Sequence, residues 1–448
     1  MASKKLSRRD LLKGIGLGAA SVVMASCTPA TQTAAPIAQS TNQPAPPSTQ
    51  LPVKQSATIR FAGWGNAEEC QLYQDIATAH MQEKSNIKIE VTCMPGSDYT
   101  QKIFAWIASG DPPDNLRTGT QYFPTLVSEG ALLDLTAYFK AQPDLLDDKQ
   151  HFTSLYSIYT VANKMYGTVL GPNVMAGYYN VDLFQKAKVD VPNSSWTFED
   201  YRAAAAKLTS GSGVGKVWGS SSSFINRENW QSQIWARGGE IFDKVEYPTK
   251  CLLNSKEAID TFKWMQDTVN KDKVAPNAAE FNAIQGGFIS GLIAMELTGT
   301  WEINARRKIK AFKWDLFPFP KDAKHVTAYL AGAVVVPKTS KSPDGAWQHA
   351  AYIQSAKAQS LIAASGLNAP MSRKVAASDV FLKLEGAPAH HAVRNDEMAV
   401  ARNRDFLFPK WAEVQSKVWA PEIEKLMLNK QTPADTAKNM ADGTQALL

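Results

Sequence analysis

Residues 58–91 read TIRFAGWGNAEECQLYQDIATAHMQEKSNIKIEV, and this stretch decides the fold class of the chain. Residues 58–62 form a short β run, which Gly63 follows. A helical stretch follows over about 68–84, because Leu72, Ile76 and Ala79 recur at helical spacing. Residues 86–91 then alternate between apolar and polar, as a half-buried strand does. This order of elements predicts an α/β fold with a largely parallel sheet.

The same alternation continues downstream. A helix over 99–109 is predicted to stop at 110–114, where glycine and two prolines prevent its continuation. About 390 residues follow the first strand, which exceeds one comfortable core, so two lobes are expected. Helices dominate after Pro343, and no tandem repeat is visible. Further strands are predicted at about 170–180, 292–295 and 334–337, and Thr197 is predicted to cap a helix.

The first 27 residues have the features of an export signal. Their apolar run, residues 11–25, is too short and too rich in glycine to span a membrane. Residues 7–13, SRRDLLK, resemble a twin-arginine signal, although signals of the general export route also carry arginines. Residues 24–27, MASC, resemble a lipobox, which predicts cleavage before Cys27 and attachment of lipid to it. An uncleaved N-terminal anchor helix is the alternative.

Residues 28–56 consist almost entirely of Thr, Pro, Ala, Gln and Ser, with Lys54 as the one charged side chain. Such a segment cannot bury enough apolar surface to offset its chain entropy, so it is predicted to be a tether. We therefore expect a signal peptide over 1–26 and a lipid-anchored linker over 27–56. The protein is expected to be exported and held at the outer face of the cell membrane or in the periplasm.

Much of the apparent basicity belongs to the signal. Its five basic residues and one acidic residue bring the net charge from +6 to +2 once residues 1–26 are removed. No stripe of lysine and arginine remains, so nucleic acid is not an expected partner. The histidines are scattered apart from His390 and His391, and no metal-ligand spacing is present. Neither a metal site nor a cofactor is expected.

Three cysteines remain when Cys27 carries lipid, an odd number for an oxidising compartment. Cys70 lies just after the first predicted strand and Cys93 at the end of the second, so the two could form a disulfide. Three buried free thiols, with Cys251 among them, are the alternative.

Enzyme motifs are weak in this chain. Residues 211–215, GSGVG, lack the Lys-Ser/Thr of a phosphate-binding loop and follow a helix, so a flexible turn is the better interpretation. Glu68–Glu69 and Asp111/Asp114 lie near predicted strand ends, but their spacing gives no acid-pair geometry.

Tryptophans at the breaks between elements are more informative. Trp64 follows the first strand, Trp230 and Trp235 lie in or beside a polar stretch, and Trp301 follows the turn at 298–300. Ligands of open α/β sheets bind beyond the carboxyl ends of the strands. Indole rings suit the C–H face of a sugar, and amide and acidic side chains suit its hydroxyls. Core packing is the alternative for any single tryptophan, but the set favours a carbohydrate cleft.

In their order and spacing, several segments resemble the extracellular solute-binding proteins of ATP-binding-cassette importers. The match is to the sugar-binding group that includes maltose-binding protein, and it runs from Thr58 to the C-terminus. The resemblance implies two α/β lobes joined by a hinge, which close on a ligand in the cleft between them and present it to the membrane permease. The segments that carry it are 99–114, 177–187, 196–197, 238–242, 299–301 and 331–338.

The resemblance also implies lobe boundaries and ligand contacts. Lobe 1 would comprise 57–171 and 326–365, and lobe 2 would comprise 172–325 and 366–448. A monomer that captures and delivers a carbohydrate, without cofactor and without breaking a bond, is expected. Glu68 and Asp98 are secondary candidates for ligand contact. The implied contacts are Trp64, Asn66, Gln121, Tyr122, Asn173, Asn226, Asn229, Trp230, Trp301 and Glu302.

The chain departs from the maltose-binding pattern at three of these positions. Gln121 and Tyr122 stand where that protein has an acid and an arginine, and Asn173 stands where it has a glutamate. The resemblance therefore implies a sugar without implying maltose. The alternatives are the same scaffold with a glycerol phosphate ester, an oligopeptide or a polyamine, or a secreted carbohydrate-active enzyme. Phosphate would require a cluster of basic side chains and a polyamine would require several carboxylates, and neither is evident among these residues.

Overall fold

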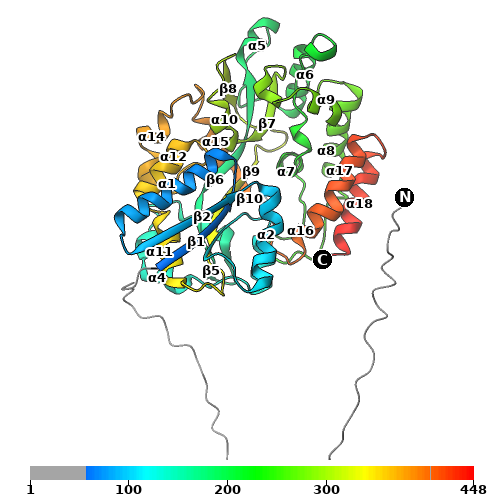
Figure 1. Ribbon diagram of the computed structural model, residues 1–448. Helices are drawn as coiled ribbons and strands as arrows, with labels where there is room; N and C mark the ends of the chain where they lie inside the picture. Colours follow the sequence, from blue (N-terminus) through cyan, green and yellow to red (C-terminus); the bar gives the residue numbers. More distant parts are fainter. Residues whose placement is uncertain (1–56, 404) are drawn as a thin grey trace, which may run out of the picture. The chain divides into compact units, whose positions relative to one another are not determined.

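The computed structural model describes residues 57–403 and 405–448. Strand β1 (Ala57–Trp64), helix α1 (Ala67–Glu83) and strand β2 (Ile87–Met94) follow one another as predicted. The two strands pair in parallel, in the arrangement that Figure 1 shows in blue. The predicted signal peptide, lipid site and tether, residues 1–56, lie outside the described residues.

Local sequence signals fix the ends of the first two helices. The side chain of Asn66 accepts a hydrogen bond from the Glu69 N–H, and the Glu69 carboxylate accepts one from the Asn66 N–H, so the two form a capping box for α1. Helix α2 (Gly96–Ser109) stops at Gly110, whose φ of +74° is a left-handed conformation that glycine adopts without strain.

The first helix is also tied covalently to the sheet. Cys70 and Cys93 form a disulfide, with their Cα atoms 5.5 Å apart, so the first turn of α1 is joined to the end of β2. The third cysteine of the described chain, Cys251, is a buried free thiol.

The main sheet mixes parallel and antiparallel pairs. Strand β3 (Asn115–Thr118) continues the parallel order beside β1. Strands β6 (Gly167–Asn180) and β9 (Thr327–Val335) then pair antiparallel with each other, and β9 also pairs antiparallel with β3. The prediction of a largely parallel sheet is therefore wrong for this half. Parallel neighbours require a strand–helix–strand crossover between them. In the described chain no such crossover joins β6 to β9, so these two strands pair antiparallel.

Further short strands pair with β6 and β9, and one hairpin forms a separate sheet. The strand predicted at 292–295 begins only at Met295. Before it, the Leu292 carbonyl and the Ala294 N–H bond to the backbone of Trp218, and the Ala294 carbonyl accepts from the Asn180 N–H. The other strands are β7 (Met295–Gly299) and β8 (Trp314–Phe317), both antiparallel to β6, β10 (Ala401–Asn403), parallel to β9, and the hairpin β4 (Thr160–Val161) and β5 (Lys164–Met165).

Strands β6 and β9 run from one hydrophobic core into another. Core A consists of buried residues within 59–170 and 331–371, with Leu407, and covers both faces of the first part of the sheet. Core B consists of buried residues within 175–328 and 406–441. Between them β6 bulges at Gly171, where φ is +149° and a Cβ would lie 2.1 Å from the Ala369 carbonyl oxygen. Glycine at this point lets the chain pass closely between the two cores.

Helices cover the two cores from outside. Beside core A, α1 packs against α12 (Ala356–Ser365) and α11 (Pro343–Tyr352). Beside core B, α8 (Lys256–Gln266) packs against α17 (Ala420–Met427) and α18 (Pro433–Gln445), which lie side by side in Figure 1. The other helices are α3 (Phe123–Ser128), α4 (Thr136–Ala141), α5 (Val181–Ala187), α6 (Phe198–Leu208), α7 (Arg227–Ala236), α9 (Ala278–Ala283), α10 (Ile303–Arg306), α13 (Arg373–Ala376), α14 (Asp379–Leu382), α15 (Val393–Val400) and α16 (Trp411–Glu413).

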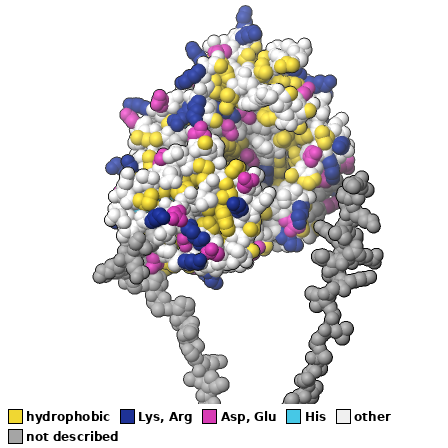
Figure 2. Space-filling view, viewed as in Figure 1, with side chains coloured by type: hydrophobic (Ala, Val, Ile, Leu, Met, Phe, Trp, Pro, Cys, Tyr) yellow, Lys and Arg dark blue, Asp and Glu magenta, His cyan; other side chains and the backbone are white. Residues whose placement is uncertain are grey.

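Two of these helices follow their sequence signals closely. Thr197 caps α6 in a capping box with Asp200, as predicted. The apolar face of α8, with Ala258, Phe262 and Met265, is buried, and Val269 continues it in a turn of π-helix over 267–271. In the part of the chain that the structure describes, no helix has both the length and the apolar character needed to cross a membrane. The face seen in Figure 2 intersperses positive and negative side chains.

Candidate functional site

Two adjoining cavities contain most of the predicted ligand contacts. The cleft cavity has a volume of about 380 Å³ and is lined by Trp64, Asn66, Gln121, Asn173 and Trp301. The side cavity, about 1190 Å³ in volume, is lined by Asn226 and Trp230 among others. Because Glu302 lines both, the two cavities meet at this carboxylate.

Strand ends position the side chains of the cleft cavity. Trp64 is the last residue of β1, and Gln121 follows β3 by three residues. Asn173 lies within β6 at the passage between the cores, and Trp301 follows β7 in a 3₁₀ turn, Thr300–Glu302. The site thus collects side chains from segments far apart in sequence. Trp64, Gln121 and Trp301 lie at or just beyond the carboxyl ends of strands, where α/β folds bind ligands, and Asn173 joins them from within β6.

A buried arginine holds Trp64 in place. The guanidinium carbon of Arg117 lies 3.9 Å from the centroid of the indole ring, and its Nη1 donates a hydrogen bond to the Trp64 carbonyl oxygen. The same nitrogen lies 3.2 Å from Oε1 of Glu69. Burial alone would lower the pKa of Arg117, but Tyr73 and Glu69 outweigh burial and raise it. Arg117 therefore stays charged and acts as a fixed support beneath one part of the ring.

Trp301 depends on a neighbouring glycine for its position. A Cβ on Gly299 would lie only 1.8 Å from Cζ3 of the indole ring, so the ring folds back over the glycine. The next residue, Thr300, donates a hydrogen bond of 3.0 Å to Oδ1 of Asn173. Asn173 in turn donates from Nδ2 to Oδ1 of Asn368. The amide of Asn173 is consequently held in one orientation at the cavity wall.

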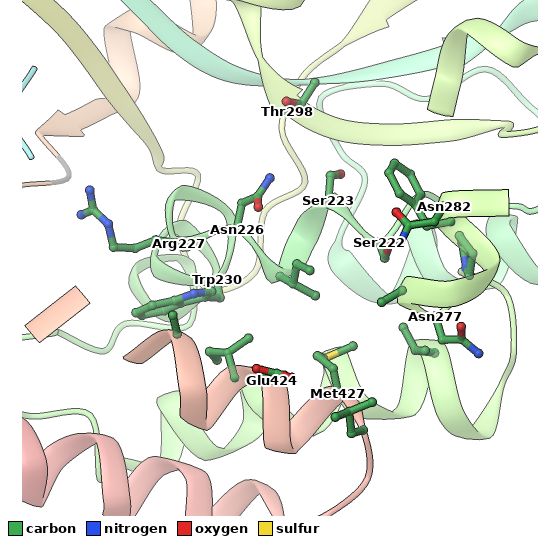
Figure 3. Close-up of a pocket in the computed structure, with 18 of the residues that line it drawn as sticks. Ser222, Ser223, Asn226, Arg227, Trp230, Asn277, Asn282, Thr298, Glu424 and Met427 are labelled. Atoms are coloured by element: carbon green, nitrogen blue, oxygen red, sulfur yellow. The ribbon is translucent and has the colours of Figure 1, made fainter. Parts of the chain in front are cut away.

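The side cavity has a polar wall and an apolar wall. Figure 3 shows Asn226, Ser223 and Thr298 above the cavity, with Met427 on the helix below it. One carboxylate of its wall, Glu296, is buried; burial raises the pKa of this group, and the adjacent guanidinium of Arg306 opposes the effect. The apolar wall includes Trp230, Trp419, Ile423, Met427 and Leu428.

Three predicted contacts are placed mainly within the protein. Tyr122 is buried behind Trp64, edge-on to its ring at 5.9 Å. Asn229 is fully buried, and its Nδ2 donates to the carbonyl oxygens of Ser223 and Leu297 at 2.8 and 3.0 Å. Trp230 is 2% exposed and packs against Trp419, with 5.3 Å between ring centroids.

The two secondary candidates lie away from both cavities. Glu68 forms an exposed ion pair with Lys308, and Asp98 lies in the first turn of α2 with Ser97 as its hydrogen-bond partner. Neither residue is among those that line the cleft cavity or the side cavity.

Sequence reasoning missed part of the cavity wall. Glu69 comes soon after the first predicted strand, so the strand-end signal that identified Trp64 could have found it. Arg117 lies in β3, a strand that the sequence analysis did not predict. Asn304 and Asn368 carry no such signal, because only the tertiary fold brings their segments to the site. The cleft-cavity lining that was not predicted includes Glu69, Arg117, Glu228, Asn304 and Asn368.

The chemistry of the cleft cavity suits binding. Five amide side chains offer both donors and acceptors, carboxylates accept, and two half-buried indoles offer flat apolar faces. In residues 57–403 and 405–448, no group of acidic, histidine or cysteine side chains is arranged to hold a metal ion. The arrangement can hold a neutral ligand that has many hydroxyl groups and an apolar face.

Comparison with known proteins agrees with this geometry. A family model described as bacterial extracellular solute-binding protein matches residues 76–389. A putative binding protein of Brucella abortus is 22% identical over 382 residues, covering 84% of this chain and 89% of the relative. An arabinooligosaccharide-binding protein of Bacillus subtilis is 29% identical over 242 residues, covering 50% of this chain and 51% of the relative.

Solved structures share the fold. A substrate-binding protein of Listeria monocytogenes in complex with cycloalternan has a TM-score of 0.80 and 24% identity, covering 87% of this chain and 98% of that one. A receptor of Streptomyces glaucescens, solved unliganded and with acarbose, has a TM-score of 0.75 and 20% identity, covering 88% and 99%. These likenesses confirm the predicted α/β fold of two lobes with a hinge and a cleft between them.

Proposed function

Since the chain belongs to the bacterial extracellular solute-binding proteins, we propose that it binds a mono- or oligosaccharide outside the cell. It delivers this sugar to the permease of an ATP-binding-cassette importer when the two lobes close, and it breaks no bond. The observation that carries the proposal is the cleft cavity, where Trp64 and Trp301 meet a set of amide side chains.

Similar proteins support a carbohydrate ligand. Structures that share the fold were solved with cycloalternan, acarbose, maltose and mannotriose. The side cavity extends the cleft cavity past Glu302, which gives room for a ligand longer than one sugar unit. The phosphate alternative receives less support, because Arg117 in the cleft cavity is already paired with Glu69.

The division of the cores supports the lobe boundaries. We propose lobe 1 at 57–171 and 326–365 and lobe 2 at 172–325 and 366–448. Core A draws on residues within 59–170 and 331–371, and core B draws on residues within 175–328 and 406–441, so each core falls largely inside one proposed lobe. Strands β6 and β9 then form the connections that a hinge requires.

We further propose that the protein works as an exported lipoprotein monomer. The lipobox residues 24–27 and the tether to residue 56 support attachment of lipid at Cys27. Mass spectrometry of the protein from its native host tests this. A lipid-modified N-terminal Cys27 is expected, whereas a chain that retains Met1, or an unmodified Cys27, would contradict it.

Calorimetric titration with a panel of mono- and oligosaccharides tests the function. At least one sugar should bind with micromolar or tighter affinity and be recovered intact. Trp301→Ala should weaken that binding by about 1–3 kcal/mol, the usual loss for a stacked aromatic anchor. Trp106→Ala is the matched control, because Trp106 lies outside both cavities. Binding of none of the sugars, or cleavage of an oligosaccharide, would overturn the proposal.

A further inference from the structure

A third cavity lies on the other side of strand β6 from the cleft cavity. It has a volume of about 560 Å³, and we call it the Arg394 cavity after the arginine in its wall. Pro172 and Val174 line it, whereas Asn173 between them lines the cleft cavity. Successive residues of a strand point to opposite faces, so the two cavities lie back to back across β6. Nothing in the proposed sugar function uses this space.

One buried cation stands in the largely apolar wall of this cavity. Arg394 lies on α15, which packs on β6, and is only 3% exposed. Its Nη1 lies 3.1 Å from Nε2 of His391, and its guanidinium carbon lies 5.0 Å from the centroid of the Phe381 ring. The apolar side chains around it include Phe152, Leu155, Pro172, Val174, Pro370, Phe381 and Met398.

The charge of Arg394 has no counter-charge in the described chain. Residues 57–403 and 405–448 provide no carboxylate within ion-pair distance of it, and its Nε and Nη2 have no hydrogen-bond partner. Burial lowers the pKa of Arg394 to about 10, which still leaves the group protonated at neutral pH. A buried and unpaired charge is costly, and an anion beside it would remove much of that cost.

The second arginine of the cavity, Arg373, already has a counter-charge. Arg373 is about half exposed, and its Nη2 lies 3.1 Å from Oδ1 of Asp148. Its guanidinium also lies over the ring of Phe152. The cavity therefore carries one uncompensated positive charge, which suits a ligand with a single negative charge.

The two unpartnered nitrogens indicate which anion fits. Nε and Nη2 lie on the same edge of a guanidinium group, and both are buried in the unliganded protein. When this edge turns toward the cavity, it binds the two oxygens of a carboxylate in parallel hydrogen bonds. We propose that the Arg394 cavity binds a small organic carboxylate with an apolar body. The carboxylate pairs with Arg394, and the apolar body lies against the side chains of Pro172, Val174 and Met398.

Calorimetric titration of the protein with benzoate, in the absence of sugar, tests this inference. Benzoate should bind with one-to-one stoichiometry, whereas benzyl alcohol and benzamidine, of similar size but neutral or positive, should not bind. Arg394→Gln should weaken benzoate binding by about tenfold or more, because the charge-assisted pair is lost. Arg373→Gln is the matched control in the same cavity and should retain binding. Absence of benzoate binding at millimolar concentration, or equal binding to the Arg394→Gln variant, would overturn the proposal.

A second measurement keeps the test independent of the folding of the variant. Crystals of the unaltered protein grown with 4-bromobenzoate should show the anomalous signal of bromine inside the Arg394 cavity. A bromine signal only at other places on the protein would reject this site. Since neither experiment uses a sugar, failure of the carboxylate site is distinguishable from failure of the proposed sugar function.

Discussion

Single residues decide how the two indole rings of the cleft cavity are presented. Trp64 rests on Arg117, and Trp301 folds over Gly299. Gly299 touches its ring from the protein side and acts on binding through the position of the ring, whereas Arg117 supports its ring and also lines the cleft cavity. Two substitutions test these roles.

Gly299→Ala places a methyl group where the Trp301 ring now lies, since the Cβ would be 1.8 Å from Cζ3. The ring must move, and sugar affinity is expected to fall by about tenfold, as for loss of an aromatic anchor. Calorimetry measures the change. Gly215→Ala is the control, because nothing lies within 4 Å of a Cβ at that glycine. Full affinity in the Gly299→Ala variant would show that the position of Trp301 is not set in this way.

Arg117→Lys keeps the positive charge but loses the planar group that stacks on Trp64. The cation–π contact and the fixed geometry weaken together, so sugar binding should lose about 1 kcal/mol. The intrinsic fluorescence of the protein should shift as Trp64 becomes less constrained. Lys102→Met removes a cation 6.0 Å from the ring of Trp106, outside both cavities, and should leave the affinity unchanged.

At this scale the sequence predicted residues whose role follows from local position. Trp64 follows the first strand, which is recognisable from its pattern, whereas Asn66 and Gln121 came from the family resemblance; all three line the cleft cavity. Asn229 looked similar in a polar stretch, but its amide bonds two backbone carbonyls inside the protein. Asn368 reaches the cavity only through the tertiary fold, and no pattern within its own segment could indicate that.

Contacts that join two elements should contribute measurably to the free energy of unfolding of the protein. The disulfide between Cys70 and Cys93 joins α1 to β2 and closes a loop with a sequence separation of 23 residues. Replacing both cysteines by serine should lower the free energy of unfolding by about 3 kcal/mol, because the unfolded chain regains the entropy of the open loop. Urea denaturation measures this decrease in the free energy of unfolding. Cys251→Ser should leave the response to reducing agent unchanged, since that thiol is unpaired.

The contact of α1 with α11 should depend on pH. His80 and His349 lie 3.2 Å apart between their Nδ1 atoms, and burial lowers their pKa values to about 4 and about 3. Well above pH 6.5 both imidazoles are neutral in the folded and in the unfolded chain. As the pH falls below that value, the unfolded chain takes up protons that the folded pair excludes, so stability is lost progressively down to about pH 3.

Urea denaturation at a series of pH values measures this loss. His80→Phe should reduce the slope of unfolding free energy against pH between 6.5 and 4, because one of the two excluded protons is then absent. A variant with an unchanged slope would assign the acid sensitivity to other groups. His391, whose pKa burial also lowers to about 4, is the first of these.

Elements were more predictable than their pairing. The first strands and helices have clear apolar periodicity and end at glycine or proline residues, and their predicted bounds agree with the structure within a few residues. The antiparallel pairing of β6 with β9 joins segments about 160 residues apart. Local pattern does not encode the direction in which such distant strands meet, because both orientations bury the same apolar side chains.

The whole molecule should unfold as one unit. Strands β6 and β9 contribute buried side chains to both core A and core B, so neither core can open without disturbing the other. Differential scanning calorimetry of the unliganded protein should therefore show a single transition, with equal calorimetric and van 't Hoff enthalpies. Two separate peaks would show that the lobes are stable independently of their shared strands.

The layout of core A also determines when it can form during synthesis. Its buried residues within 62–169 pack against residues 331–371, which leave the ribosome about 160 residues later. At ribosomal rates of about 5–20 residues per second, the first segment waits roughly 10–30 s for its partner. During that interval its apolar side chains are exposed to chaperones and proteases. A nascent chain arrested shortly before residue 331 should be cleaved by protease within residues 62–169, and the same residues should resist cleavage in a chain released at full length.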